Sequence, residues 1–113
     1  MQSDLNMESM ERIAFKMKLF NDCEAEYKKR HDAIWPELKS LLKETGVEDY
    51  SIFFDKDTHI LFGVLKIKDV FKLDELPQHP VMRKWWDSLT DIMETNDDSS
   101  PKSIPLKEIF YLK

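Results

Sequence analysis

The sequence predicts a single α+β domain with the element order β-α-β-β-α-β, the split βαβ pattern of ferredoxin-like folds. Segments in which apolar and polar side chains alternate with period two indicate strands at four places. Two longer segments with apolar residues at helical spacing stand between these strands. The length of 113 residues suits one domain and leaves no room for two.

Composition narrows the class of protein. The net charge of −5 and the shortness of the basic run Lys28–Arg30 argue against a nucleic-acid surface, and this run is expected to form a solvated helix face. The single cysteine, Cys23, excludes an internal disulfide and suits a reducing cytoplasm. Residues 1–11 contain no apolar run of the kind found in a signal peptide or membrane span. We therefore expect a cytoplasmic protein with a flexible tail at 1–11 and one domain at 12–113.

The first strand is predicted at Ile13–Leu19, where four apolar residues alternate with Ala14 and two lysines. Asn21 and Asp22 offer capping side chains for a helix that follows. Pro36 lacks an N–H and disfavours the α conformation of the residue before it, so this helix is predicted to break between Asp32 and Trp35.

A column of ring-bearing side chains runs along this broken helix. Tyr27, His31 and Trp35 are spaced by four and share one face. One interpretation is a core histidine satisfied by one hydrogen bond. The other is functional: the break places His31 on the last turn of the first segment, where the helix dipole favours the imidazolium form. A histidine protonated near neutral pH is suited to act as a general acid.

The second helical segment is predicted to begin at Pro36 and to end at Gly46. A hairpin should follow, with strands at 50–55 and 60–67 that are apolar on both faces. Two helices cover only one face of a four-stranded sheet, so the other face needs a different cover. A second copy of the chain would supply it, and we expect a homodimer whose sheets pack face to face.

The remaining elements are a short helical piece at 70–76, a helix at 81–95 and a closing strand at 106–112. Trp85 and Trp86 are adjacent on this helix and point about 100° apart. One of them is expected in the core and the other is free to face a ligand, although both could be core residues. Asp55 is a candidate base, but a role in capping the hairpin turn is favoured.

Two other histidines, His59 in the hairpin turn and His79 between prolines, are expected to be exposed to solvent rather than catalytic. The polar loop at 97–100 lacks the ligand alternation and closing glutamate of an EF-hand loop. No metal-ligand spacing is found, so no metal site is predicted.

Four stretches of this sequence resemble the L-rhamnose mutarotases: residues 27–38 (YKKRHDAIWPEL), 50–55 (YSIFFD), the Trp85-Trp86 pair and 109–112 (IFYL). The likeness runs from about Ile13 to Lys113. It implies the dimeric α+β barrel fold and an isomerase that interconverts the α and β anomers of L-rhamnose by acid/base-assisted ring opening and closure. No cofactor is needed for such proton transfers.

The resemblance also implies site residues. It makes His31 the proton donor and gives the sugar contacts to four aromatic side chains, Tyr27, Tyr50, Trp85 and Trp86. Residues 32–33 (DA) and 88–90 (SLT) depart from what some members carry, which leaves the sugar preference open. Alternatives are a mutarotase for another sugar such as L-fucose, a cofactor-free monooxygenase of the same barrel fold, and a non-catalytic ligand-binding dimer.

Overall fold

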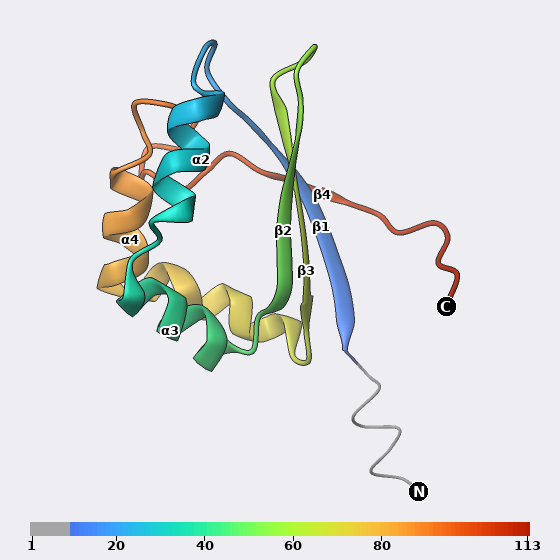
Figure 1. Ribbon diagram of the computed structural model, residues 1–113. Helices are drawn as coiled ribbons and strands as arrows, with labels where there is room; N and C mark the ends of the chain where they lie inside the picture. Colours follow the sequence, from blue (N-terminus) through green and yellow to red (C-terminus); the bar gives the residue numbers. More distant parts are fainter. Residues whose placement is uncertain (1–9) are drawn as a thin grey trace, which may run out of the picture.

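The structure is a computed structural model that describes residues 10–113. The predicted tail lies outside the described residues except for Met10 and Glu11, and Glu11 already belongs to the first strand. The elements in chain order are β1 (Glu11–Lys18), α2 (Glu24–Asp32), α3 (Pro36–Thr45), β2 (Glu48–Asp55), β3 (Ile60–Ile67), the 3-10 helix η1 (Val70–Gln78), α4 (Pro80–Asp87) and β4 (Ile104–Leu106). All the helices lie on one face of a single sheet (Figure 1).

The sheet has the strand order β2-β3-β1-β4, and every neighbouring pair is antiparallel. This order confirms the predicted ferredoxin-like α+β fold. β1 and β3 pair along their full length, from Glu11 opposite Ile67 to Lys18 opposite Ile60. The odd-numbered residues of both strands therefore face the helices, and the even-numbered residues form the outer face.

The core lies between the sheet and the helices. Leu61, Leu65 and Ile67 of β3 are buried on the inner face, with Leu38 of α3 packed in the same layer. No helix within residues 10–113 combines the length and the apolar character that crossing a membrane requires.

The predicted break in the first helix is confirmed. α2 ends at Asp32, Trp35 has an extended backbone (ψ 135°), and α3 begins with Pro36 at its first position. Gly46 ends α3 with φ at 102°, a left-handed conformation that a residue with a side chain adopts only at a cost. The predicted cap is wrong: Cys23 is the N-cap of α2 and makes no side-chain capping bond. Asp22 instead occupies the preceding turn with φ at 62°.

Two predicted element ends are also wrong. α4 ends at Asp87 rather than at residue 95, and the Ser88 hydroxyl donates a hydrogen bond of 2.6 Å to the Trp85 carbonyl where the helix stops. Turns then carry Leu89 and Ile92 into the core without helical backbone. The closing strand is confined to Ile104–Leu106.

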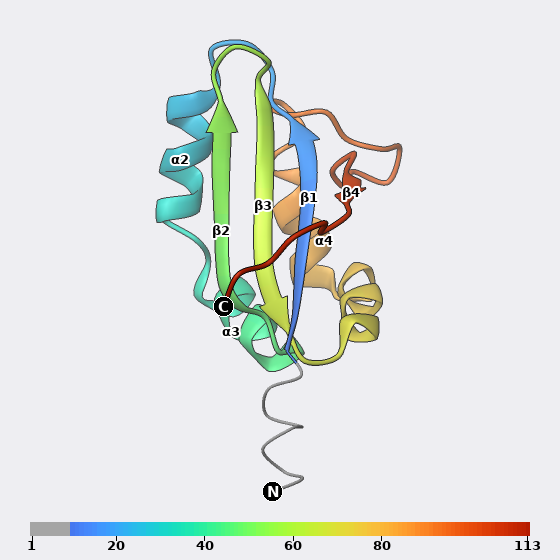
Figure 2. The same cartoon turned by 90° about the vertical axis from the view of Figure 1, so that its right-hand side faces the viewer.

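Residues 107–113, here called the C-terminal arm, leave the sheet and cross its outer face (Figure 2). β4 pairs with β1 only opposite Ala14–Lys16, so the chain beyond it has no strand partner within the described part of the protein. The arm exposes four consecutive apolar residues, Ile109 to Leu112. Arg12 holds it by a 2.8 Å ion pair with Glu108 and lies 3.6 Å from the centre of the Tyr111 ring.

Candidate active site

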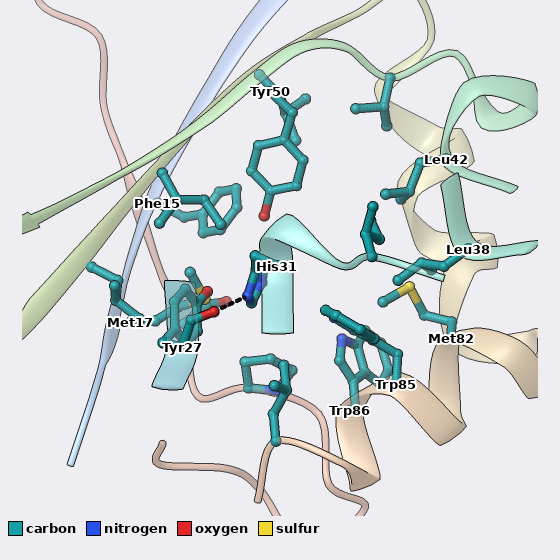
Figure 3. A pocket seen from close by; sticks show the side chains of 18 of the residues that line it. Phe15, Met17, Tyr27, His31, Leu38, Leu42, Tyr50, Met82, Trp85 and Trp86 are labelled. Atoms are coloured by element: carbon teal, nitrogen blue, oxygen red, sulfur yellow. Dashed lines mark hydrogen bonds between the residues drawn. The ribbon is translucent and has the colours of Figure 1, made fainter. Parts of the chain in front are cut away.

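A cavity of about 1440 Å³ lies between the inner face of the sheet and the helices (Figure 3). The helix break turns α3 away from α2 (Figure 1), and residues of both segments line the cavity. Five aromatic or imidazole side chains predicted to form the site all line this cavity: Tyr27, His31, Tyr50, Trp85 and Trp86. They come from three elements, α2, β2 and α4.

The orientation of His31 is fixed by a hydrogen bond within its own helix. Its Nδ1 lies 2.9 Å from the carbonyl oxygen of Tyr27. Because a carbonyl oxygen only accepts, Nδ1 carries the proton and donates it. In the neutral ring, Nε2 is therefore the unprotonated nitrogen and a hydrogen-bond acceptor.

Aromatic rings on two sides hold the imidazole in place. The Tyr27 ring stacks on it with centroids 4.0 Å apart, and Trp85 meets it edge-on at 5.2 Å. Trp85 also lies edge-on to Trp35 at 5.2 Å. Tertiary packing and the hydrogen bond therefore restrain the same ring, which gives a preorganised group for proton transfer.

The charge state of His31 differs from the expectation. Burial lowers the pKa of His31, and this effect outweighs the opposing effects of the Tyr27 carbonyl and the Asp32 carboxylate. The expectation that the end of the helix favours the imidazolium form is wrong, because the ring turns into the cavity among aromatic side chains. The neutral form, with Nε2 free to accept a proton, therefore predominates at neutral pH.

The two tyrosines keep their protons. Tyr27 is buried, and burial raises the pKa of its phenol above the usual value. Burial also raises the pKa of Tyr50 to about 12. As much as 41% of the surface of Tyr50 is accessible, but the phenol projects into the cavity rather than away from the protein (Figure 3). Both hydroxyls can therefore donate hydrogen bonds to a ligand.

A bulge in β2 places Tyr50. Glu48 pairs with Lys66 and Ser51 pairs with Val64, so Asp49 and Tyr50 stand opposite one residue of β3. Bulges re-aim side chains next to functional sites, and here the phenol extends toward His31 from the sheet (Figure 3).

The two tryptophans occupy different environments, as their angular separation predicts. Trp85 is buried, while Trp86 is partly exposed on the cavity wall. Together the side chains provide one imidazole, two protonated phenols and two indole rings around one space. This combination suits a small neutral ligand with hydroxyl groups and C–H surfaces, because hydroxyls pair with the polar tips and C–H groups pack on the rings.

Known proteins are similar to this sequence over nearly its whole length. The family model for L-rhamnose mutarotase matches residues 12–112. An L-rhamnose mutarotase from Flavobacterium johnsoniae is 57% identical over 94% of this chain and 99% of its own. One from Rhizobium meliloti is 55% identical over 92% of this chain and 100% of its own. The chain belongs to the L-rhamnose mutarotase family.

Solved structures agree with this assignment. The crystal structure of the L-rhamnose mutarotase from Formosa agariphila superposes with a TM-score of 0.85 at 50% identity, covering 91% of this chain and 99% of that one. A conserved protein from Methanosarcina mazei reaches a TM-score of 0.62 at 15% identity, over 94% of this chain and 99% of that one, and shares the fold. Membership of this family makes the protein an isomerase, as predicted.

Other titratable residues of the protein have different roles. Asp55 accepts hydrogen bonds from the Thr58 hydroxyl at 2.8 Å and the Asp57 amide at 3.0 Å, and these bonds lower its pKa. Its role in capping the hairpin turn is confirmed. His79 is exposed as predicted, whereas His59 is partly buried beside the Phe54 ring. Within residues 10–113, no group of three or more histidine, cysteine or acidic side chains could hold a metal ion.

One functional connection was missed by the sequence prediction. Arg30 was expected on a solvated face, but its guanidinium donates to the Ser88 carbonyl at 2.6 Å and to both carboxylate oxygens of Asp91 at 2.9 and 3.1 Å. It also pairs with Glu26 at 2.7 Å. Arg30 thus ties α2, which carries His31, to the turn that follows the two tryptophans.

Proposed function

We propose that this protein interconverts the α and β anomers of L-rhamnose by opening and closing the sugar ring, with His31 as the proton donor. Membership of the family supports the substrate. The observation that carries the mechanism is the hydrogen bond from His31 Nδ1 to the Tyr27 carbonyl, because it leaves Nε2 as the nitrogen that exchanges protons with a ligand.

The proposed reaction transfers one proton between two sugar oxygens and breaks one carbon–oxygen bond. Neutral His31 accepts the proton of the anomeric hydroxyl at Nε2, and the resulting oxyanion forms a carbonyl as the bond from the anomeric carbon to the ring oxygen breaks. The imidazolium then donates the same proton to the ring oxygen. The two oxygens share one carbon, so a single nitrogen can reach both, and rotation of the aldehyde before the reverse steps yields the other anomer.

The aromatic residues have binding roles in this proposal. Tyr27 and Tyr50 donate hydrogen bonds to sugar oxygens, since their raised pKa values keep both phenols protonated. Trp86 packs its ring against a C–H face of the sugar, and Trp85 supports His31 from the core.

The test is proton NMR saturation transfer between the anomeric protons of L-rhamnose, with L-fucose and D-glucose in parallel. We expect faster exchange for L-rhamnose, and a loss of about 10²–10⁴-fold in His31→Ala, the range typical of one acid–base group. His79→Ala is the matched control, because His79 is exposed and lies outside the cavity. Acceleration with L-fucose alone would change the substrate. Acceleration with none of the sugars would overturn the proposed activity.

We also propose that the protein acts in the cytoplasm as a homodimer, with the outer faces of two sheets packed together as in a dimeric α+β barrel. The outer face supports this arrangement, because Phe53, Ile104 and Leu106 leave 63%, 58% and 39% of their surfaces exposed there. The arm adds further exposed apolar residues to the same side of the sheet (Figure 2). The lone Cys23 is compatible with a reducing compartment.

A further inference from the structure

Gly63 and Phe15 are matched across the centre of the sheet. Gly63 of β3 stands opposite Phe15 of β1, and both face the helices. A Cβ atom added at Gly63 would lie 2.5 Å from Cζ and 2.6 Å from Cε2 of the Phe15 ring. The ring therefore lies over the backbone of β3 in space that is available only because residue 63 has no side chain.

This ring forms part of the cavity wall. Phe15 lines the cavity, and its centroid lies 6.2 Å from that of Tyr50 (Figure 3). Met17 and Leu61, its neighbours on the inner face, also line the cavity and are buried. The side chains of Phe15, Met17 and Leu61 are apolar, and the Tyr50 hydroxyl and His31 supply polar atoms next to them (Figure 3).

L-rhamnose has a matching asymmetry. Its C6 is a methyl group, while most hexoses carry a hydroxymethyl group there, and its other exocyclic substituents are hydroxyls. When the hydroxyls pair with these polar atoms, the methyl group needs apolar side chains to pack on, because a hydroxyl buried there would lose its hydrogen bonds to water.

We propose that Phe15, seated on Gly63, forms the subsite for the C6 methyl group and is a specificity-determining residue of this enzyme. The inference rests on the proposed function, in that L-rhamnose is the substrate. It assigns the discrimination between substituents at C6 to a residue of the sheet rather than to the residues that transfer the proton.

Two sugars isolate the contribution of C6. L-mannose differs from L-rhamnose by one hydroxyl on C6, and L-lyxose lacks C6 while keeping the configuration of the neighbouring ring carbons. A single methyl group in an apolar pocket gives about 10–200-fold discrimination, and an added hydroxyl about 10²-fold. We expect kcat/KM of the native protein to favour L-rhamnose over both sugars within these ranges.

The first variant is Gly63→Ala. Its Cβ must push the Phe15 ring off β3 and into the space assigned to the methyl group. We expect kcat/KM for L-rhamnose to fall about ten-fold, of the order of one lost methyl contact. The kcat/KM for L-lyxose should stay within about two-fold of that of the native protein, because L-lyxose has no C6 atom to place in that space. The double variant Gly63→Ala/Phe15→Leu should restore the preference for L-rhamnose over L-lyxose, since the shorter side chain removes the clash.

The second variant is Phe15→Leu alone. The shortened side chain removes part of the apolar contact that favours the methyl group and leaves more room for the larger hydroxymethyl group of L-mannose. We expect the preference for L-rhamnose over L-mannose to narrow about ten-fold. Phe71→Leu is the matched control, since Phe71 is 76% exposed and does not line the cavity. This variant decides the question by itself if Gly63→Ala does not fold.

Each result is a ratio of two sugars on one variant, so a change in the folded fraction cancels. Equal losses for L-rhamnose and L-lyxose in Gly63→Ala, or an unchanged L-mannose ratio in Phe15→Leu, would overturn the inference. A native protein that accelerates no L-rhamnose exchange would overturn the proposed function instead, so the two failures are distinguishable.

Discussion

Opposing influences act on the pKa of His31, and together they favour the neutral ring. The Tyr27 carbonyl and the Asp32 carboxylate favour the cation, but burial among aromatic rings lowers the pKa more strongly. A neutral imidazole with Nδ1 already protonated has one free lone pair, on Nε2. In the proposed mechanism the residue is therefore a proton acceptor at rest, and it becomes a donor only after it has taken a proton from the substrate.

This assignment predicts a definite pH profile. Because the active form is neutral and its pKa is lowered from 6.5, kcat/KM should stay level at neutral pH and fall as the pH drops through the lowered pKa. Saturation transfer between about pH 5 and pH 8, corrected for uncatalysed exchange, measures the profile. A rate that rises towards acidic pH would show instead that the resting form is the imidazolium.

Tyr50 should affect binding more than chemistry. Tyr50→Phe removes one hydroxyl donor but keeps the ring, so we expect KM to rise about 2–10-fold, which corresponds to one hydrogen bond, with little change in kcat. Tyr111→Phe on the C-terminal arm is the matched control, because Tyr111 does not line the cavity. A loss confined to kcat would assign Tyr50 to proton transfer.

At the scale of elements, the site depends on how α2 and α4 are held together. The helix break frees the end of α2 at the cavity, and Arg30 ties this helix to the segment after α4 through Ser88 and Asp91. A basic residue next to His31 in sequence thus acts on the site through its attachment to another element.

Arg30→Met should loosen this connection while keeping the apolar stem of the side chain. We expect a fall in Tm of several degrees and a higher KM, because the walls carrying His31 and Trp86 lose their shared anchor. Lys28→Met is the control in the same helix: it removes the exposed pair with Asp32, which contributes little. Thermal unfolding and saturation kinetics measure both effects, and equal behaviour of the two variants would contradict the role of Arg30.

Element boundaries were predictable where one residue decides them locally. Pro36 and Gly46 act through their own backbones, so the sequence predicts the break and the end of α3 correctly. Leu89 and Ile92 keep helical spacing after α4 has ended, because turns bury apolar side chains as well as a helix does. The Phe15–Gly63 and Arg30–Asp91 contacts join residues far apart in the sequence, so a local pattern does not indicate them. The stretches that resemble the family, by contrast, indicated five residues that all line one cavity.

At the scale of the whole molecule, the sheet separates two surfaces of different composition. Its inner face carries Tyr50 into the cavity, and its outer face exposes Phe53 and the apolar side chains of β4. The five predicted site residues come from one chain, so pairing of two outer faces would leave each cavity intact.

Phe53→Asp tests this pairing. A charge within an apolar interface costs more than the contact gains, so we expect the mass from light scattering to fall from that of two chains to that of one. Phe71→Asp, at another exposed aromatic residue, should keep the dimer. A native protein with the mass of one chain would refute the proposed assembly.

The packing of Trp85 has a spectroscopic consequence. The sequence contains three tryptophans, and Trp85 lies edge-on to Trp35 while Trp86 forms cavity wall. Indole fluorescence of the native protein therefore originates entirely from Trp85 and Trp86, which line the cavity, and from Trp35, which packs on Trp85. Emission should respond to a sugar that displaces water from Trp86, and to a positive charge on His31 beside Trp85. The unlabelled protein thus contains its own optical probe of ligand occupancy and of the charge on the imidazole.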